Sequence, residues 1–377
     1  MSKWPGKYVI GLTGNIATGK SVVRKMLEHL GAYSIDADAL SHRAIAKGAP
    51  GYQKVITTFG KWIVAGDGEI DRAKLGRLVF SDPDALLQLE VIVHPLVEQA
   101  VDLMIKRAGQ RVVVIEAIKL LESKLAKACD TIWTTYAPET IQKSRLMRKR
   151  NMSEQEALQR IHAQSPQEKK TAAANAVIQN TGSFENTWKQ VVAAWKVISP
   201  VSDTPPVVIR KATDGELSVQ RGRPRDSNNI AAFITRFSNG TNPLTQDDIM
   251  AAFGEKAFLL LLSDKKLVGL AGWQVENLVA RIIDLYIDSN IPVERALKIL
   301  VAEVERASQD LQCEASLFFL SAQVAGQESV WHELGYSRRT LQTLGVQAWR
   351  DAAMESQPPD TILLFKQLRQ DRILRPI

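Results

Sequence analysis

The stretch Gly14-Asn15-Ile16-Ala17-Thr18-Gly19-Lys20-Ser21 decides the fold of the first half of this chain. It satisfies the pattern G-x-x-x-x-G-K-[ST], whose backbone N–H groups surround the phosphates of a nucleotide. A strand is predicted directly before it, over 8–12, and apolar residues recur at helical spacing directly after it, over 20–30. This order points successive N–H groups and a helix N-terminus at the phosphates. We therefore predict a nucleoside-triphosphate site, in which Lys20 reaches the β- and γ-phosphates and the Ser21 hydroxyl ligates Mg²⁺.

Strand-like runs and helical patterns alternate along the first half. Further strands are expected over 32–35, 112–115 and 131–134. Such alternation is typical of a parallel sheet wrapped by helices. The sequence thus predicts an α/β fold of the P-loop NTPase kind.

Carboxylates follow two of these predicted strands. Asp36 and Asp38 come after the strand over 32–35, and Glu116 comes after the strand over 112–115. In an open parallel sheet these ends face the same crevice as the phosphate loop, residues 14–21. An aspartate there can take the proton of an acceptor hydroxyl, although a helix N-cap is the alternative. Glu116 either holds the metal through water or is a solvated strand end.

A basic cluster lies in a predicted helix further on, made of Lys143, Arg145, Arg148, Lys149 and Arg150. Guanidinium groups closing over phosphates would neutralise charge that develops in a transition state. A solvated basic face is the alternative. The histidines show no metal-ligand spacing, so we expect no metalloenzyme.

The second half has a different organisation. Three prolines within Ser199–Pro206 predict an extended linker over 198–207. Beyond it, strands are expected over 207–211, 257–263, 267–275, 280–287 and 314–320, and a helix over 292–309. The second and third of these strands flank Asp264-Lys265-Lys266 as a hairpin, which indicates a mixed α/β domain. Arg221-Gly222-Arg223-Pro224-Arg225 is predicted to be a solvated basic turn.

Composition bounds the class of protein. The chain has 377 residues, 45% hydrophobic and 24% charged, which predicts two or three globular domains. No run of about 18 apolar residues occurs, so we expect no membrane span. The start Met-Ser-Lys-Trp-Pro leads directly into the first strand, and we expect no secretory signal. Cys129 and Cys313 lack CxxC spacing, which excludes a disulfide framework or a cysteine-based zinc site and fits the reducing cytoplasm.

The net charge of +7 is unevenly distributed. Residues 1–200 carry 28 Lys and Arg against 19 Asp and Glu, whereas residues 201–377 carry 20 against 22. A basic excess suits a polyphosphate ligand or a nucleic acid. No run of five or six like charges is present, so we expect no nucleic-acid partner.

The first 195 or so residues resemble dephospho-CoA kinase, the P-loop enzyme that phosphorylates the ribose 3′-hydroxyl of dephospho-CoA to give coenzyme A. The resemblance rests on ordered segments that span almost the whole half. They are Gly11-Leu12-Thr13-Gly14, Ile35-Asp36-Ala37-Asp38, Gly48-Ala49-Pro50, Ile70-Asp71-Arg72, Leu75–Phe80, Asp82-Pro83, Ile92–Pro95, Gln142–Arg150 and Arg160-Ile161 with Gln164.

The resemblance implies a role for each matched position. Asp38 would be the general base, and Lys20 and Ser21 would serve the phosphates of ATP and Mg²⁺. The phosphate loop with Val22 would bind ATP, and a helical lid carrying Arg145 and Arg148 would fold over it. A mostly helical region from Asp71 to His94 would shape the acceptor pocket. The residues implied in dephospho-CoA binding are Asp36, His42, Arg72, Arg77 and His94.

Some positions depart from the family pattern. Asn15 and Ala17 replace two glycines of the phosphate loop, and Val22 replaces a usual threonine. Glu116 stands where the family usually has Asp, and Ile118-Lys119 disrupts the usual Pro-Leu-Leu. The segment Asn175-Ala176-Val177-Ile178-Gln179-Asn180 carries Asn in place of the customary Asp.

The second half resembles the GNAT acetyltransferase fold. The resemblance rests on Val208–Ala212, Leu267–Gly272 and Trp331–Tyr336. The family's glycine-rich pyrophosphate loop should fall near 290–297, but Ile291–Ala296 has no glycine. Backbone amides could not approach a pyrophosphate as closely there.

These observations favour a dephospho-CoA kinase domain over 1–200, with an appended non-catalytic GNAT-like domain over 205–377 whose protein partner is unknown. Two alternatives stay open. The chain is either bifunctional, with an active N-acetyltransferase in its second half, or a regulatory module that binds nucleotide without turnover.

Overall fold

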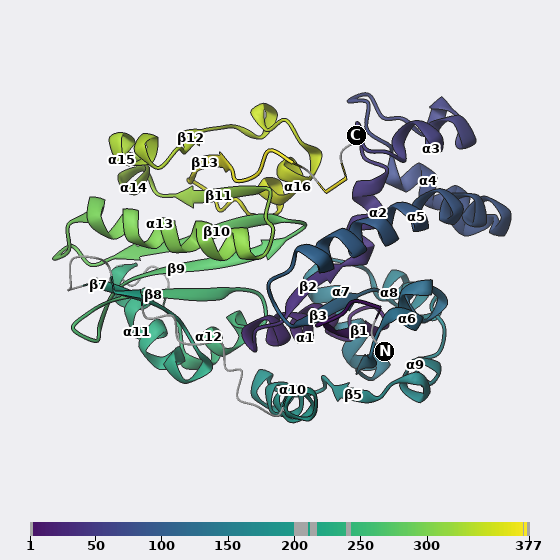
Figure 1. The fold of residues 1–377 in the computed structure, drawn as a ribbon, viewed down its shortest axis with the longest axis horizontal. Helices are drawn as coiled ribbons and strands as arrows, with labels where there is room; N and C mark the ends of the chain where they lie inside the picture. The colour runs from purple at the N-terminus through teal and green to yellow at the C-terminus, as the bar shows by residue number, and fades with distance from the viewer. Residues whose placement is uncertain (1–2, 200–209, 212–216, 239–242, 372, 375–377) are drawn as a thin grey trace.

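A computed structural model describes residues 3–199, 210–211, 217–238, 243–371 and 373–374. The chain forms two sheets that lie side by side, one from each half (Figure 1). The linker expected over 198–207 lies almost entirely outside the described residues, as do residues 207–209 of the next predicted strand. Within these described ranges, no helix is both long and apolar enough to cross a membrane.

The first sheet has five parallel strands in the order β2-β3-β1-β4-β5. Its strands are β1 (Tyr8–Gly14), β2 (Tyr33–Asp36), β3 (Val112–Glu116), β4 (Thr131–Tyr136) and β5 (Ala176–Gln179). The central strands are buried on both faces, and β3 is apolar until its last residue. Such continuous apolar runs are typical of parallel sheets covered on both sides. The predicted parallel α/β fold is confirmed, and the strand bounds differ from those expected by one or two residues.

Helices cover this sheet and extend away from it (Figure 1). They are α1 (Lys20–His29), α2 (Ala37–Ala44), α3 (Tyr52–Phe59), α4 (Arg72–Ser81), α5 (Pro83–Arg107), α6 (Lys124–Ala128), α7 (Glu139–Arg150), α8 (Glu154–His162), α9 (Gln167–Ala173) and α10 (Phe184–Ile198). Asp71 and Asp82 cap α4 and α5 by accepting backbone N–H bonds. The region expected to be mostly helical, from Asp71 to His94, is therefore helical.

The second sheet has eight strands in the order β12-β13-β11-β10-β9-β8-β7-β6. Its strands are β6 (Arg210–Lys211), β7 (Leu217–Arg221), β8 (Ala257–Ser263), β9 (Lys266–Glu276), β10 (Val279–Ile287), β11 (Ala315–Leu320), β12 (Ser337–Arg338) and β13 (Ile362–Gln367). All neighbours pair antiparallel except β10 and β11. The expected mixed domain and its hairpin around Asp264 are confirmed.

Both faces of this second sheet carry helices. They are α11 (Ser227–Phe237), α12 (Gln246–Ala252), α13 (Val293–Asp310), α14 (Ala322–Ala325), α15 (Glu328–Glu333) and α16 (Gln347–Ser356). The predicted helix over 292–309 is α13, which buries Leu297, Leu300 and Val304 against one face. Helices α11 and α12 pack against the other face, through a separate apolar cluster.

One prediction for the second half is wrong. The basic segment from Arg221 was expected to be a solvated turn, yet Arg221 is the last residue of β7 and pairs with Leu259 of β8. Its guanidinium lies 5.8 Å from the ring of Trp273 and is turned towards the first half. Only Arg225 is fully exposed. The pairing of β7 with β8 continues as far as Arg221, so this residue belongs to the strand and the turn begins after it.

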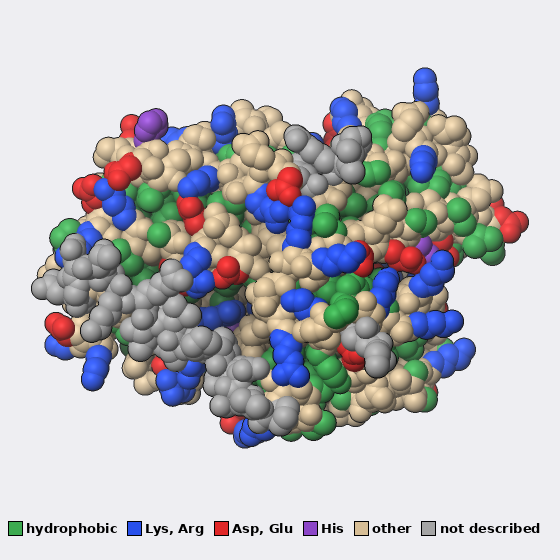
Figure 2. Space-filling model, in the orientation of Figure 1, with side chains coloured by type: hydrophobic (Ala, Val, Ile, Leu, Met, Phe, Trp, Pro, Cys, Tyr) green, Lys and Arg blue, Asp and Glu red, His purple; other side chains and the backbone are tan. Residues whose placement is uncertain are grey.

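The two halves are joined by buried polar contacts. Arg43 of α2 forms an ion pair of 2.5 Å with Glu314 and donates a hydrogen bond to the Asn277 carbonyl. Gln312 donates a hydrogen bond to the Met104 carbonyl. In contrast, charged side chains of both signs are scattered over the outer surface of both halves (Figure 2). The Arg43–Glu314 pair is thus shielded from water, unlike most ion pairs of this protein.

We expect Arg43→Met to lower the free energy of unfolding by about 3–5 kcal/mol, because it removes the guanidinium that pairs with the buried Glu314 carboxylate at 2.5 Å. Lys149→Met is the matched control, since the Lys149–Glu255 pair also joins the two halves but is 68% and 61% exposed. Its cost should stay below about 1 kcal/mol. Urea unfolding of the full chain measures both. Equal losses in the two variants would contradict a special role for Arg43.

Candidate active site

The phosphate loop joins β1 to α1 and has a tightly determined backbone. Gly19 has a φ of 96°, and a Cβ built on it would lie 1.8 Å from Asn180 Nδ2. Asn180 Nδ2 in turn donates to the Thr18 carbonyl at 3.0 Å. The Thr18 hydroxyl donates to the Asn15 carbonyl at 2.8 Å and lies 2.7 Å from the Thr135 hydroxyl. Only glycine fits at position 19.

The two residues that replace glycines in this loop are both accommodated. Asn15 donates to the Ser165 carbonyl at 2.8 Å, and its neighbour Ile16 donates its N–H to Gln164 Oε1 at 2.7 Å. Ala17 adopts a φ of 59° and packs beside the apolar cluster of α7 and α8. The Asn15 side chain therefore links the phosphate loop to Ser165, in the segment that follows α8, and Ala17 adds an apolar contact with α7 and α8.

Lys20 begins α1 and is buried, with 8% of its surface exposed. Its Nζ donates to the Asn15 carbonyl at 3.4 Å. Burial lowers the pKa of Lys20, and the nearby charges of Glu116, Asp38 and Asp36 oppose that shift. Ser21, next to it, is exposed on the first turn of α1.

Three carboxylates share the edge of the sheet beside Lys20. Asp36 of β2 is level with Glu116 of β3 in the strand register, and its side chain caps α2 by accepting the Ala39 N–H at 2.8 Å. Asp38, in the first turn of α2, accepts the Ile118 N–H at 3.0 Å. Burial, and then the charge of Asp36, raise the pKa of Asp38. The N-cap alternative thus applies to Asp36, whereas the Asp38 carboxylate accepts from Ile118, just beyond the end of β3.

Glu116 is not a solvated strand end, because only 5% of it is exposed. It forms a buried ion pair of 2.6 Å with Arg24 of α1. Burial raises the pKa of Glu116 to about 7 even though Arg24 lowers it. Arg24 also lies 3.6 Å from Glu28, one turn further along α1. The phosphate-loop motif ends at Ser21 and therefore does not include Arg24. Its place in the first turns of α1, directly after the loop, is the local feature that could have indicated a role.

The basic helix α7 divides into two parts. Arg145 donates to the carbonyls of Ala17 and Asn180, at 3.0 and 2.8 Å, and so closes against the phosphate loop. Arg148 and Arg150 are exposed. The structure therefore brings Arg145 to the loop and leaves Arg148 at the surface.

Lys170 of α9 also lies in the crevice, although sequence reasoning missed it. It is 3% exposed and donates to the Ile118 carbonyl at 2.8 Å, beside the N–H that Asp38 accepts. Burial and the charge of Lys20 lower the pKa of Lys170 to about 8. Two adjacent lysines in a short polar helix carry no signal that one is buried.

The residues implied in acceptor binding separate into two groups. His42 and Arg72 line a cavity of about 310 Å³, which is also lined by Gln347 and Asp351 of α16. Arg72 lies 3.7 Å from Asp351. Arg77 and His94 are exposed on α4 and α5 and do not line this cavity. The second half thus forms one wall of the space beside α2 and α4.

We expect Gly19→Ala to lower the free energy of unfolding by at least about 2 kcal/mol, because the new methyl group meets Asn180 and the backbone is left-handed. Gly109→Ala is the control, since its Cβ would meet nothing within 4 Å. It should change stability by less than about 1 kcal/mol. Chemical denaturation measures both, and two variants of equal stability would contradict the close approach to Asn180.

Comparison with known proteins agrees with this arrangement. The sequence profile of the family described as dephospho-CoA kinase matches residues 8–186. A dephospho-CoA kinase of Carboxydothermus hydrogenoformans is 45% identical over 194 residues, which is 50% of this chain and 94% of that protein. One from Bacillus licheniformis is 42% identical over 189 residues, 48% of this chain and 92% of that protein.

The second half is similar to solved acetyltransferases of the GNAT family. One from Streptococcus pneumoniae is 15% identical, with a TM-score of 0.32, and the match covers 40% of this chain and 99% of that one. The relatives matched by the first half are thus covered almost completely, at high identity and in the part that holds the phosphate loop. This chain belongs to the dephospho-CoA kinase family.

Proposed function

We propose that residues 1–200 transfer the γ-phosphoryl group of ATP to the ribose 3′-hydroxyl of dephospho-CoA, giving coenzyme A. The observation that carries this proposal is the position of Asp38, whose carboxylate lies close enough to Lys20 for its charge to raise the pKa of that lysine. The basic excess of this half then matches the negative charge of both substrates. The two cysteines are free, which fits a reducing cytoplasm.

Asp38 is proposed as the general base. Its oxygen that accepts from Ile118 is held in place, which leaves the other oxygen to accept the proton of the acceptor hydroxyl. The raised pKa of Asp38 makes its carboxylate a stronger base than one in water. Lys20, Lys170 and Arg145 are the cations proposed to face the transferred phosphates and to neutralise the charge that develops on them.

The site fits Mg²⁺ as well as ATP. In the described part of the chain, no three His, Cys, Asp or Glu side chains come together as a complete metal site. Magnesium is usually held by one or two protein groups together with phosphate oxygens and water. Ser21, exposed beside the loop, would ligate the ion, and Glu116 would hold it through water. When bound, the ion supplies charge neutralisation between the phosphates.

We propose that the second half, residues 205–377, is not an acetyltransferase. The helix α13 begins after Pro292, which has no N–H to donate, and its first turn carries Glu294. A carboxylate at a helix N-terminus disfavours an anionic pyrophosphate there. In addition, Asp288 already accepts the Asn290 N–H at 3.0 Å.

The test is formation of coenzyme A by the full-length protein supplied with ATP, Mg²⁺ and dephospho-CoA. We expect Asp38→Ala to lower kcat by about 100- to 10,000-fold while the affinity for ATP stays nearly unchanged, because general-base assistance acts in the chemical step. Asp84→Ala, at an exposed position of α5, is the control.

Two outcomes would contradict the proposal. A wild-type kcat in Asp38→Ala would mean that another group takes the proton, with Asp36 the next candidate. ATP binding by the wild-type protein without any coenzyme A formed would favour the regulatory module instead.

A second prediction concerns the wall that α16 contributes. We propose that the cavity lined by His42, Arg72 and Asp351 binds the acceptor. Arg72→Gln should then raise KM for dephospho-CoA by about three- to tenfold, since it removes a cation from this cavity. Asp351→Asn should lower that KM, because its carboxylate competes with an anionic substrate for Arg72. KM for ATP should not change in either variant. Asp360→Asn, exposed in the same half, is the control. Changes of the same sign in Arg72→Gln and Asp351→Asn would refute this competition.

A further inference from the structure

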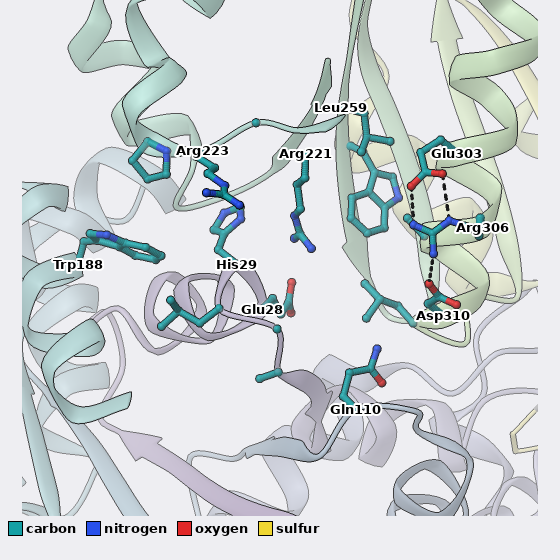
Figure 3. A pocket seen from close by; sticks show the side chains of 18 residues that line it. Glu28, His29, Gln110, Trp188, Arg221, Arg223, Leu259, Glu303, Arg306 and Asp310 are labelled. Carbon is teal, nitrogen blue, oxygen red and sulfur yellow. Dashed lines mark hydrogen bonds and ion pairs between the residues drawn. The ribbon is translucent and has the colours of Figure 1, made fainter. Parts of the chain in front are cut away.

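A cavity of about 330 Å³ lies between the two halves, away from the phosphate loop. The first half contributes the end of α1, with Glu28 and His29, together with Trp188 of α10 (Figure 3). The second half contributes Arg221 at the end of β7 and the last turns of α13. Because α1 has ten residues, the phosphate loop at its other end is about 15 Å away. The cavity is also at the opposite end of α13 from Pro292.

The acidic side chains of this cavity already have cations. Glu28 lies 2.5 Å from Lys25 and also accepts from Ser34. Burial raises the pKa of Glu28, but Lys25 and Arg24 lower it to about 2, so this group is ionised and compensated. On the other wall, Arg306 bridges Glu303 and Asp310, and Figure 3 shows these three joined to one another. Each of the three carboxylates that line the cavity therefore already has a cationic partner, Lys25 for Glu28 and Arg306 for Glu303 and Asp310.

Two arginines of the cavity, Arg221 and Arg223, are not held in such ion pairs with any described residue. Among the residues the structure describes, neither Arg221 nor Arg223 forms an ion pair with a carboxylate. The Nε of Arg221 is buried and has no hydrogen-bond partner. Burial lowers the pKa of Arg221, and the charge of Glu28, which raises it, offsets this shift only in part. A buried donor left unpaired is costly, and in a native protein it usually marks a missing partner.

The remaining walls are aromatic and uncharged. Trp273 flanks the guanidinium of Arg221, and Trp188 lies across the cavity from it (Figure 3). His29 lies next to Arg223, and its Nε2 is 2.8 Å from the Phe253 carbonyl. Burial and Arg221 lower the pKa of His29 to about 3, so this ring is neutral. The cavity thus combines flat apolar surfaces with two guanidinium groups that form no ion pair with a described residue.

We propose that this cavity binds a small phosphate monoester carried on a flat ring. Two guanidinium groups match the −1.5 to −2 charge of a phosphate monoester, and their planar N–H groups fit its oxygens. The indole surfaces would pack against the ring. A volume of about 330 Å³ is at the lower end of the range for small-molecule sites, which excludes a ligand as large as coenzyme A. The site is separate from the proposed kinase reaction and does not depend on it.

The test is calorimetric titration of phenyl phosphate into the full chain, with the phosphate loop first saturated by a non-hydrolysable ATP analogue and Mg²⁺. We expect one phenyl phosphate to bind per chain. Arg221→Gln and Arg223→Gln should each weaken binding at least tenfold. Arg225→Gln, exposed in the same segment, should leave it unchanged. Inorganic phosphate should bind more weakly than phenyl phosphate, because it lacks the ring.

Thermal unfolding of each variant shows whether it is folded. Arg221→Gln should not lower the melting temperature, since it removes a desolvated guanidinium that, among the described residues, forms no ion pair and whose Nε has no hydrogen-bond partner. If that variant fails to fold, Arg223→Gln still tests the site. No binding at millimolar phenyl phosphate would overturn the proposal. Equal affinity in the Arg223 and Arg225 variants would also overturn it, as would inorganic phosphate binding as tightly as phenyl phosphate.

Discussion

Charge balance at the carboxyl edge of the first sheet is the constraint on which the site depends. Parallel pairing of β1, β2 and β3 brings Asp36, Glu116 and the phosphate loop to one edge that is largely closed to water. A charge buried there without a partner would cost several kcal/mol. Lys20 and Arg24 supply the opposite charges, and Arg24 is as buried as Lys20. The ion pair between Arg24 of α1 and Glu116 therefore stabilises the carboxylates at this edge of the sheet.

The second half packs against the kinase half through several contacts far apart in the structure, of which three bear on α1, α2 and α4. The Arg43–Glu314 pair holds α2 against the second sheet, α16 forms one wall of the cavity lined by His42 and Arg72, and the Phe253 carbonyl lies 2.8 Å from His29 Nε2 at the end of α1. These contacts surround the kinase half on the side of α1 and α2. The second half thus supplies walls and charges to the cavity that is also lined by His42 and Arg72 of the kinase half.

Periodicity and motif chemistry predicted much of the fold and part of the site. The strand expected over 257–263 is β8, since an apolar run reports burial directly. Strand ends placed Asp36 and Glu116 beside the phosphate loop. Lys170 was missed, because its contact joins residues 52 positions apart and leaves no local pattern. Gln164 belongs to the resemblance, but its hydrogen bond with the Ile16 N–H, 148 positions away, left no sign in the sequence. Arg77 and His94 belong to the resemblance, but they face solvent on their helices.

By itself, the sequence determined the phosphate loop, the alternation of strands and helices in the first half and the mixed sheet of the second. These features depend on local backbone conformation and on the spacing of apolar residues. Only the tertiary structure decided that Arg221 leaves solvent, that Asp351 reaches Arg72 and that Lys170 joins the crevice. Burial and pairing of a charged side chain depend on which distant groups surround it, and that is set when the helices and sheets pack together.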